Sequence, residues 1–232
     1  MKLLSINASN TKIAKTQKGE KIPTRLASLS LYPDDIICAG SKAAKCQDGC
    51  LVSAGRGRFD NVANARRAKT AFFHADKSGF IDQLKTELSN FDKLCKRQNV
   101  RGVVRLNTIS DIAYEQYGIP QAFPDLKFYD YTKRVNRIGK TPDNYKLMFS
   151  YSGAVTYRNQ VAKMPAGYPM AVVFRGELPT DFMGRKVIDG DISDLDNLRA
   201  GHVVVGLRAK GKAKKDTTGF VVDSNLIAIG AL

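Results

Sequence analysis

The sequence predicts an α/β protein built as a full or partial (β/α) barrel, with a cysteine-rich loop after the first strand. Short apolar stretches alternate with helical or loop stretches along most of the chain, which is typical of parallel βα units. Polar side chains recur where the predicted strands end, and three of the four cysteines lie in one loop over residues 38–59. These observations together favour a parallel α/β architecture over a sandwich.

Length and composition are compatible with one large core. The chain has 232 residues, 43% of them hydrophobic, and α/β barrels commonly reach this length as one domain. We expect an N-terminal arm over residues 1–25, which is rich in Lys, Ser and Thr, and a single barrel domain over residues 26–232. No apolar run approaches the roughly 18 residues of a membrane helix, so no membrane partner is expected.

Eight stretches rich in apolar residues are the predicted strands. The first leads directly into the cysteine loop, and the short link between the sixth and seventh leaves open whether those two pair in parallel or antiparallel. The stretches occupy residues 25–33, 102–111, 126–133, 145–152, 170–176, 185–191, 202–210 and 219–223.

Two helices are expected after the loop. The first begins near Asp60, and its apolar side is expected to carry Val62, Ala65, Ala68 and Phe72. The second runs from about Gly79 to Gln98, and its apolar stripe is formed by Phe80, Leu84, Leu88, Phe91 and Cys95. Because cysteine on such a stripe behaves as a small hydrophobic residue, Cys95 is assigned to the core rather than to a metal site.

The other three cysteines, Cys38, Cys46 and Cys50, have the spacing C-x7-C-x3-C in a loop rich in Gly and Ala. Thiolates prefer soft metals, and a loop without histidine favours an iron–sulfur cluster over catalytic zinc. A [4Fe–4S] cluster on three cysteines leaves one iron open to a non-protein ligand. Structural zinc, which needs a fourth ligand, and plain or disulfide-bonded cysteines are the alternatives.

A second candidate site lies at the C-terminal ends of the predicted strands. In a TIM-like barrel these ends form the face that holds the active site. The cations there would clamp the carboxylate or phosphate of a small anionic ligand, and the acids would bind its hydroxyl or amino groups. The candidate residues are Arg105, Asn107, Asp130, Arg175, Asp189, Asp191, Arg208 and Lys210.

The charge of the chain indicates a second kind of partner. Lys and Arg number 37 against 22 Asp and Glu, which gives a net charge of +15. Such a balance favours nucleic acid or another polyanion, and the run LRAKGKAKKD (residues 207–216) is a candidate contact. The turn Gly55–Arg58 is interpreted as the exit of the cysteine loop. With only His74 and His202 present, a Ser-His-acid hydrolase is not expected.

Several strings of the chain resemble a family of uncharacterised bacteriophage proteins that carry three cysteines near the N-terminus. The strings are CAGSKAAKCQDGCLVSAGRGRF, ARRAKTAFF, VRLNTISDI, KFYDYTKR, VIDGDISD and VVGLRAKGKAKKD. The resemblance covers nearly the whole chain. It implies a phage gene product that acts in the cytoplasm of a bacterial host.

The order of strand, three-cysteine loop and helix is also similar to that of radical S-adenosylmethionine enzymes. Their usual spacing is C-x3-C-x2-C, which differs from the one here. That resemblance implies a cluster whose open iron binds S-adenosylmethionine. The sequence thus favours a phage iron–sulfur protein. If the protein is an enzyme, we expect it to catalyse redox or radical chemistry. A basic nucleic-acid-binding factor with a structural metal loop and an electron-transfer or host-interaction protein stay open as alternatives.

The cluster hypothesis predicts a brown protein when the chain is purified without oxygen. Cys38→Ala, Cys46→Ala or Cys50→Ala should each remove the colour, because every thiolate is needed as a ligand. Iron and acid-labile sulfide analysis checks this prediction, with Cys95→Ala as the control that keeps the metal. Stoichiometric zinc without labile sulfide would contradict it.

Overall fold

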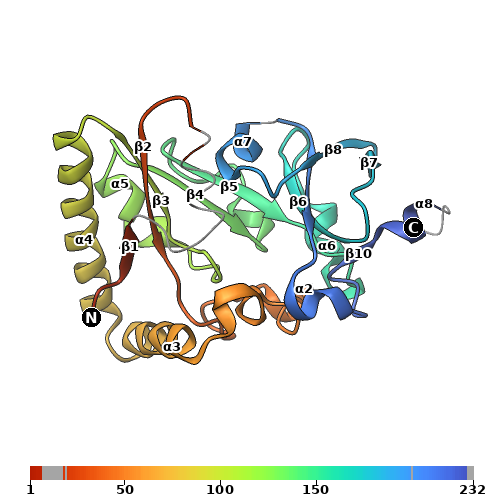
Figure 1. The fold of residues 1–232 in the computed structure, drawn as a ribbon, viewed down its shortest axis with the longest axis horizontal. Helices are drawn as coiled ribbons and strands as arrows, with labels where there is room; N and C mark the ends of the chain where they lie inside the picture. Colours follow the sequence, from red (N-terminus) through yellow and green to blue (C-terminus); the bar gives the residue numbers. More distant parts are fainter. Residues whose placement is uncertain (7–17, 19, 200, 229–232) are drawn as a thin grey trace. The chain divides into compact units, whose positions relative to one another are not determined.

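The computed structural model describes residues 1–6, 18, 20–199 and 201–228 and shows a mixed α/β protein (Figure 1). Its packing divides into two compact units. The first unit contains residues 1–38, 59–130 and 140–146, and the second contains residues 39–58, 131–139 and 147–232. Strands β4 (Lys127–Thr132) and β5 (Tyr145–Ser150) each begin in the first unit and end in the second.

The first unit is built on a parallel set of strands with one antiparallel strand at its start. Strand β1 (Leu4–Ile6) pairs antiparallel with β2 (Thr24–Leu29), with Leu4 opposite Leu29. β2 pairs in parallel with β3 (Arg101–Arg105), and β3 pairs in parallel with β4. The shorter helical elements of this unit are η3 (Tyr114–Tyr117) and α5 (Ile119–Ala122).

Two long helices, α3 (Asp60–Ala75) and α4 (Lys77–Arg97), follow one another with a single residue between them. That residue, Asp76, caps α4, because its carboxylate accepts a hydrogen bond from the backbone N–H of Gly79 at 2.8 Å. The predicted stripe of α4 is confirmed, since all five of its side chains are at most 3% exposed. Helix α4 packs closely on β3, where a Cβ at Gly102 would lie 3.2 Å from the sulfur of Cys95.

The predicted apolar face of α3 is wrong by part of a turn. Ala65 and Ala68 are exposed, whereas Ala63, Thr70 and Phe73 are buried. The hydroxyl of Thr70 accepts a hydrogen bond from the backbone N–H of Tyr32 at 2.8 Å and donates one to its carbonyl oxygen at 3.0 Å. A polar residue therefore fixes the face of α3 that packs inward.

The described start of the chain is held by the two helices. The carboxylate of Glu87 accepts hydrogen bonds from the backbone N–H groups of Leu3 and Leu4 at 2.8 and 2.7 Å. The ammonium of Lys69 donates to the carbonyl oxygen of Leu3 at 2.7 Å, and burial lowers the pKa of Lys69. Residues 7–17 and 19 of the predicted arm lie outside the described part of the chain.

The second unit is also mostly parallel. Strand β6 (Met170–Arg175) pairs in parallel with β5, β9 (Val204–Arg208) and β10 (Val222–Asp223). β9 pairs in parallel with β8 (Arg185–Asp189), which forms an antiparallel hairpin with β7 (Asp181–Phe182). The parallel alternative left open for the sixth and seventh predicted strands, β8 and β9, is thus the observed one.

Short helices complete the second unit. The cysteine loop within it forms α2 (Ser41–Ala44), η1 (Leu51–Ser53) and η2 (Gly55–Arg58). The others are η4 (Val135–Arg137), η5 (Val155–Tyr157), α6 (Arg158–Ala162), α7 (Asp194–Arg199), η6 (Gly211–Lys215) and α8 (Ser224–Ala228).

All eight predicted stretches contain a strand, and the mixed α/β class is confirmed. Strands β1 and β7 were not predicted, so the cysteine loop follows the second strand of the chain rather than the first. Closure of the strands into a barrel stays a prediction, as does the single domain. None of the helices in the described ranges has the length and apolar character needed to cross a membrane.

The place of Cys95 in the core predicts a packing role. Cys95→Ala should lower the free energy of unfolding by about 1 kcal/mol, since it removes one small buried group. Chemical denaturation followed by circular dichroism checks this value. A loss above about 3 kcal/mol, or loss of bound metal from this variant alone, would contradict the assignment.

Candidate functional site

The candidate residues Asn107 and Asp130 form a buried network in the first unit. Asp130 is fully buried on β4, and its carboxylate accepts hydrogen bonds from the backbone N–H and side-chain amide of Asn107 at 2.7 and 3.1 Å. It also accepts one from the hydroxyl of Tyr145 at 2.9 Å. The amide oxygen of Asn107 in turn accepts from Ser110 and from the backbone of Ile112, both at 2.8 Å. These bonds give the buried charge a structural role.

Tyr114 lies in the same buried region. Its side chain is fully buried, and its hydroxyl has no hydrogen-bond partner among the described residues. Burial raises the pKa of Tyr114 well above its usual range, and the nearby charge of Asp130 adds to the effect. The phenol is therefore neutral at any physiological pH. The candidate Arg105 lies over the ring of Tyr129, with 5.7 Å between the guanidinium carbon and the ring centre.

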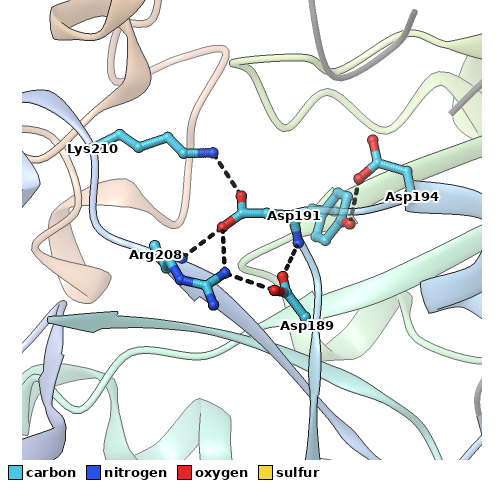
Figure 2. Close-up of polar contacts among 6 residues, drawn as sticks. Asp189, Asp191, Asp194, Arg208 and Lys210 are labelled. Atoms are coloured by element: carbon cyan, nitrogen blue, oxygen red, sulfur yellow. Dashed lines mark hydrogen bonds and ion pairs between the residues drawn. The ribbon is translucent and has the colours of Figure 1, made fainter. Parts of the chain in front are cut away.

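Four other candidates meet in the second unit, at the C-terminal ends of β8 and β9 (Figure 2). The guanidinium of Arg208 lies 2.8 Å from Asp189 and 3.5 Å from Asp191, and the ammonium of Lys210 lies 2.6 Å from Asp191. The backbone N–H of Arg208 also donates to Asp191 at 3.2 Å. We call these four residues the acid–base cluster.

The acid–base cluster lies near solvent. Side-chain exposure is 45% for Arg208, 50% for Lys210 and 34% for Asp189, while Asp191 is 21% exposed. The hydrogen bond from Arg208 holds the pKa of Asp189 below its usual range. Each positive charge of the cluster has a carboxylate beside it.

The last candidate, Arg175, is paired elsewhere in the same unit. Its guanidinium donates to the carboxylate of Asp223 at 2.8 and 3.1 Å, across the pairing of β6 with β10. It also donates to the backbone carbonyl of Asp216 at 2.7 Å. The hydrogen bond from Arg175 lowers the pKa of Asp223. Sequence reasoning missed Asp216 and Asp223, since nothing in their neighbourhood along the chain points to a distant arginine.

The thiols of the cysteine loop act as hydrogen-bond donors to the backbone. The sulfur of Cys38, in the first unit, lies 3.7 Å from the carbonyl oxygen of Ile109. The sulfur of Cys46, in the second unit, lies 3.8 Å from the carbonyl oxygen of Ser41. A thiolate ligand would give up such a bond. Among the described residues no group of three or more His, Cys, Asp or Glu is arranged to hold a metal, and the cluster on Cys38, Cys46 and Cys50 stays a prediction.

The cysteine loop packs on the lysine-rich segment after β9. Cys46 lies against a buried apolar cluster, and the backbone N–H of Lys212 donates to the hydroxyl of Ser53 at 3.1 Å. The hydroxyl of Thr218 donates to the carbonyl oxygen of Lys45 at 3.4 Å. The apolar cluster consists of Ala209, Ala213, Phe220 and Val221.

Exposed cations cover both of these segments. We call these cations the basic surface. The sequence indicated only the cations of the segment after β9 as a group. The members of the basic surface are Lys45, Arg56 and Arg58 from the cysteine loop, and Lys212, Lys214 and Lys215 from η6.

Comparison with known protein families identifies the family of this chain. The model of the Gene product 88 family matches residues 2–224. The chain belongs to this family. The match supports the phage-type family indicated by the sequence strings, whereas no curated protein and no solved structure matches the chain. The resemblance to radical S-adenosylmethionine enzymes therefore stays a prediction for this Gene product 88 protein.

The buried network predicts a large effect of a small change at Asp130. Asp130→Asn places an amide N–H₂ beside donors from Asn107 or Tyr145, which should cost about 2–4 kcal/mol of unfolding free energy. The exposed change Asp82→Asn on α4 is the matched control and should stay within about 0.5 kcal/mol of the parent. Denaturation curves check both values. An Asp130→Asn protein of unchanged stability would contradict the structural role.

Proposed function

We propose that this protein binds nucleic acid through the basic surface, by contacts to backbone phosphates that do not depend on base sequence. The observation that carries the proposal is the packing of two cation-rich segments into one surface of the second unit. Phosphate contacts by Lys and Arg release condensed counterions and supply most of the affinity of such binding.

The two segments are held close together by the backbone. Gly211 has a φ of +56°, and a Cβ placed there would lie 2.7 Å from the hydroxyl oxygen of Ser53. A Cβ at Gly49 would lie 3.0 Å from the ring of Phe220. Only glycine allows this approach without displacement of its neighbours. The cations of η6 are thereby presented beside those of the cysteine loop.

The acids of these two segments do little to offset that charge. Residues 39–58 and 208–216 hold nine Lys and Arg but only Asp48 and Asp216. Asp216 is 8% exposed, and its carboxylate accepts from the hydroxyl of Thr218 at 2.7 Å and from the backbone N–H of Val221 at 3.0 Å. Its oxygens are directed to the turn that follows η6, which leaves the exposed lysines facing solvent.

The alternative of a small anion held by the strand ends has less support. Arg175 is paired with Asp223, and Arg208 and Lys210 are paired with Asp189 and Asp191. Three of the four cations that the small-ligand hypothesis needs thus have carboxylate partners already, and the fourth, Arg105, lies over the ring of Tyr129. Most cations of the basic surface, in contrast, lie on exposed 3-10 turns. Iron–sulfur chemistry, a structural metal in the cysteine loop, electron transfer and action in the host cytoplasm stay predictions.

The elements that carry the basic surface support contacts to the backbone rather than to bases. They are η2 and η6, with four and five residues, and the end of the four-residue helix α2, which Lys45 follows. Reading bases in the major groove takes a helix or a two-stranded ribbon that enters the groove. Short turns with protruding lysines instead suit phosphates, which position a protein without carrying sequence information.

The test is a charge reversal on η6. Lys212→Glu, Lys214→Glu and Lys215→Glu together should weaken binding to duplexes of any sequence and lower the salt slope of log Kobs by about three, since each lysine lost removes about one phosphate contact. Fluorescence anisotropy with labelled DNA and RNA duplexes, repeated over a series of salt concentrations, measures both quantities.

The matched control reverses three exposed lysines outside the basic surface, Lys93→Glu, Lys146→Glu and Lys163→Glu. It changes the net charge by the same amount and should retain most of the affinity. Equal loss in the two triple variants would show that only net charge matters. Absence of binding by the parent protein at low salt would refute the proposed function.

A further inference from the structure

We infer that Asp189 and Asp191 act as built-in competitors of nucleic-acid phosphates, by occupying Arg208 and Lys210 and thereby setting how tightly the basic surface binds. This inference rests on the proposed function. It assigns the acid–base cluster a role in the interface: its two cations become phosphate contacts when the carboxylates release them.

The chain places the cluster beside the basic surface. Lys210 directly precedes η6, and its carbonyl oxygen accepts a hydrogen bond from the backbone N–H of Ala213 at 3.1 Å inside that turn. The positions Arg208, Lys210 and Lys212 follow one another at every second residue. The basic surface thus continues into the two cations that the carboxylates hold.

The carboxylates are arranged much as a phosphate group would be. Asp189 and Asp191 present oxygens to one guanidinium, at 2.8 and 3.5 Å, and Asp191 uses its other oxygen for Lys210 (Figure 2). Arg and Lys bind carboxylates and phosphates with the same donors. The backbone N–H of Asp191 donates to Asp189 at 2.9 Å, which keeps the two side chains together.

Exposure makes this competition reversible. The Arg208 and Lys210 side chains are 45% and 50% exposed, and ion pairs in such positions contribute little to stability. A double helix presents one negative charge for about every 1.7 Å of its axis. That density of phosphates can draw the two cations away from the carboxylates at small cost to the fold.

The experiment neutralises the competitors. Asp189→Asn with Asp191→Asn should tighten binding to a labelled DNA duplex about threefold to tenfold near 100 mM salt and raise the salt slope by about two, one for each cation released. Asp189→Asn alone is a second variant, because it leaves the contact between Asp191 and the backbone of Arg208 intact, and it should show a smaller gain. Thermal melting of each variant verifies the fold.

Two controls separate this inference from general electrostatics. Asp82→Asn with Glu177→Gln removes two exposed acids elsewhere and should leave the affinity within about twofold. Arg208→Gln with Lys210→Gln should abolish the gain in the Asp189→Asn, Asp191→Asn background, because the gain depends on these two cations.

The outcomes distinguish the two proposals. If the η6 charge reversal abolishes binding while Asp189→Asn, Asp191→Asn binds no better than its control, the competitor role is overturned and the basic surface stands. An equal gain in the control pair would also overturn it, because net charge would then be sufficient. If the η6 charge reversal weakens binding no more than its own control does, the proposed function itself fails.

Discussion

The packing of the cysteine loop on the segment after β9 determines where this protein displays its charge. Cys46 lies against the apolar cluster of that segment, and the close approaches at Gly49 and Gly211 leave no room for a side chain between the two. Burial of apolar area holds the contact, and the backbone bond to Ser53 fixes its register. The lysines and arginines of the basic surface are exposed to solvent. The basic surface is a consequence of this packing.

The sequence predicted the strands and helices correctly where many residues repeat the same pattern. Eight apolar stretches produced eight strands, and the stripe of α4 was found with Cys95 on it, because each of these patterns is carried by several large side chains at a fixed period. The sequence did not predict an element correctly where a single polar contact determines its position. The hydrogen bonds between Thr70 and Tyr32 determine which face of α3 is buried. Strand β1, with three residues, depends on the Glu87 carboxylate more than 80 positions away.

The candidate site shows the same division between local pattern and distant partner. That Asp189, Asp191, Arg208 and Lys210 would lie at strand ends followed from period-two alternation, and the parallel pairing of β8 with β9 brings them together. Mutual ion pairs among the strand-end charges were one alternative, but the particular partners, such as Asp223 for Arg175, did not follow, because the sequence position of a charged residue does not identify its partner. The same applies to the thiols of Cys38 and Cys46, whose backbone acceptors the cysteine spacing did not indicate. The cluster on Cys38, Cys46 and Cys50 stays a prediction.

Two kinds of carboxylate in this protein illustrate why exposure decides what a charged group can do. Asp130 is fully buried, and Asn107 and Tyr145 donate to it, so removing any of these bonds would leave a desolvated polar group without compensation. Such a group can hold a fold together but cannot exchange partners. Asp189 and Asp191 make bonds of similar length at the surface, where water replaces a lost partner at little cost. Only carboxylates of the second kind can yield their cations to an incoming phosphate, and this is the physical reason why we propose the acid–base cluster, rather than the buried network, as part of a binding surface.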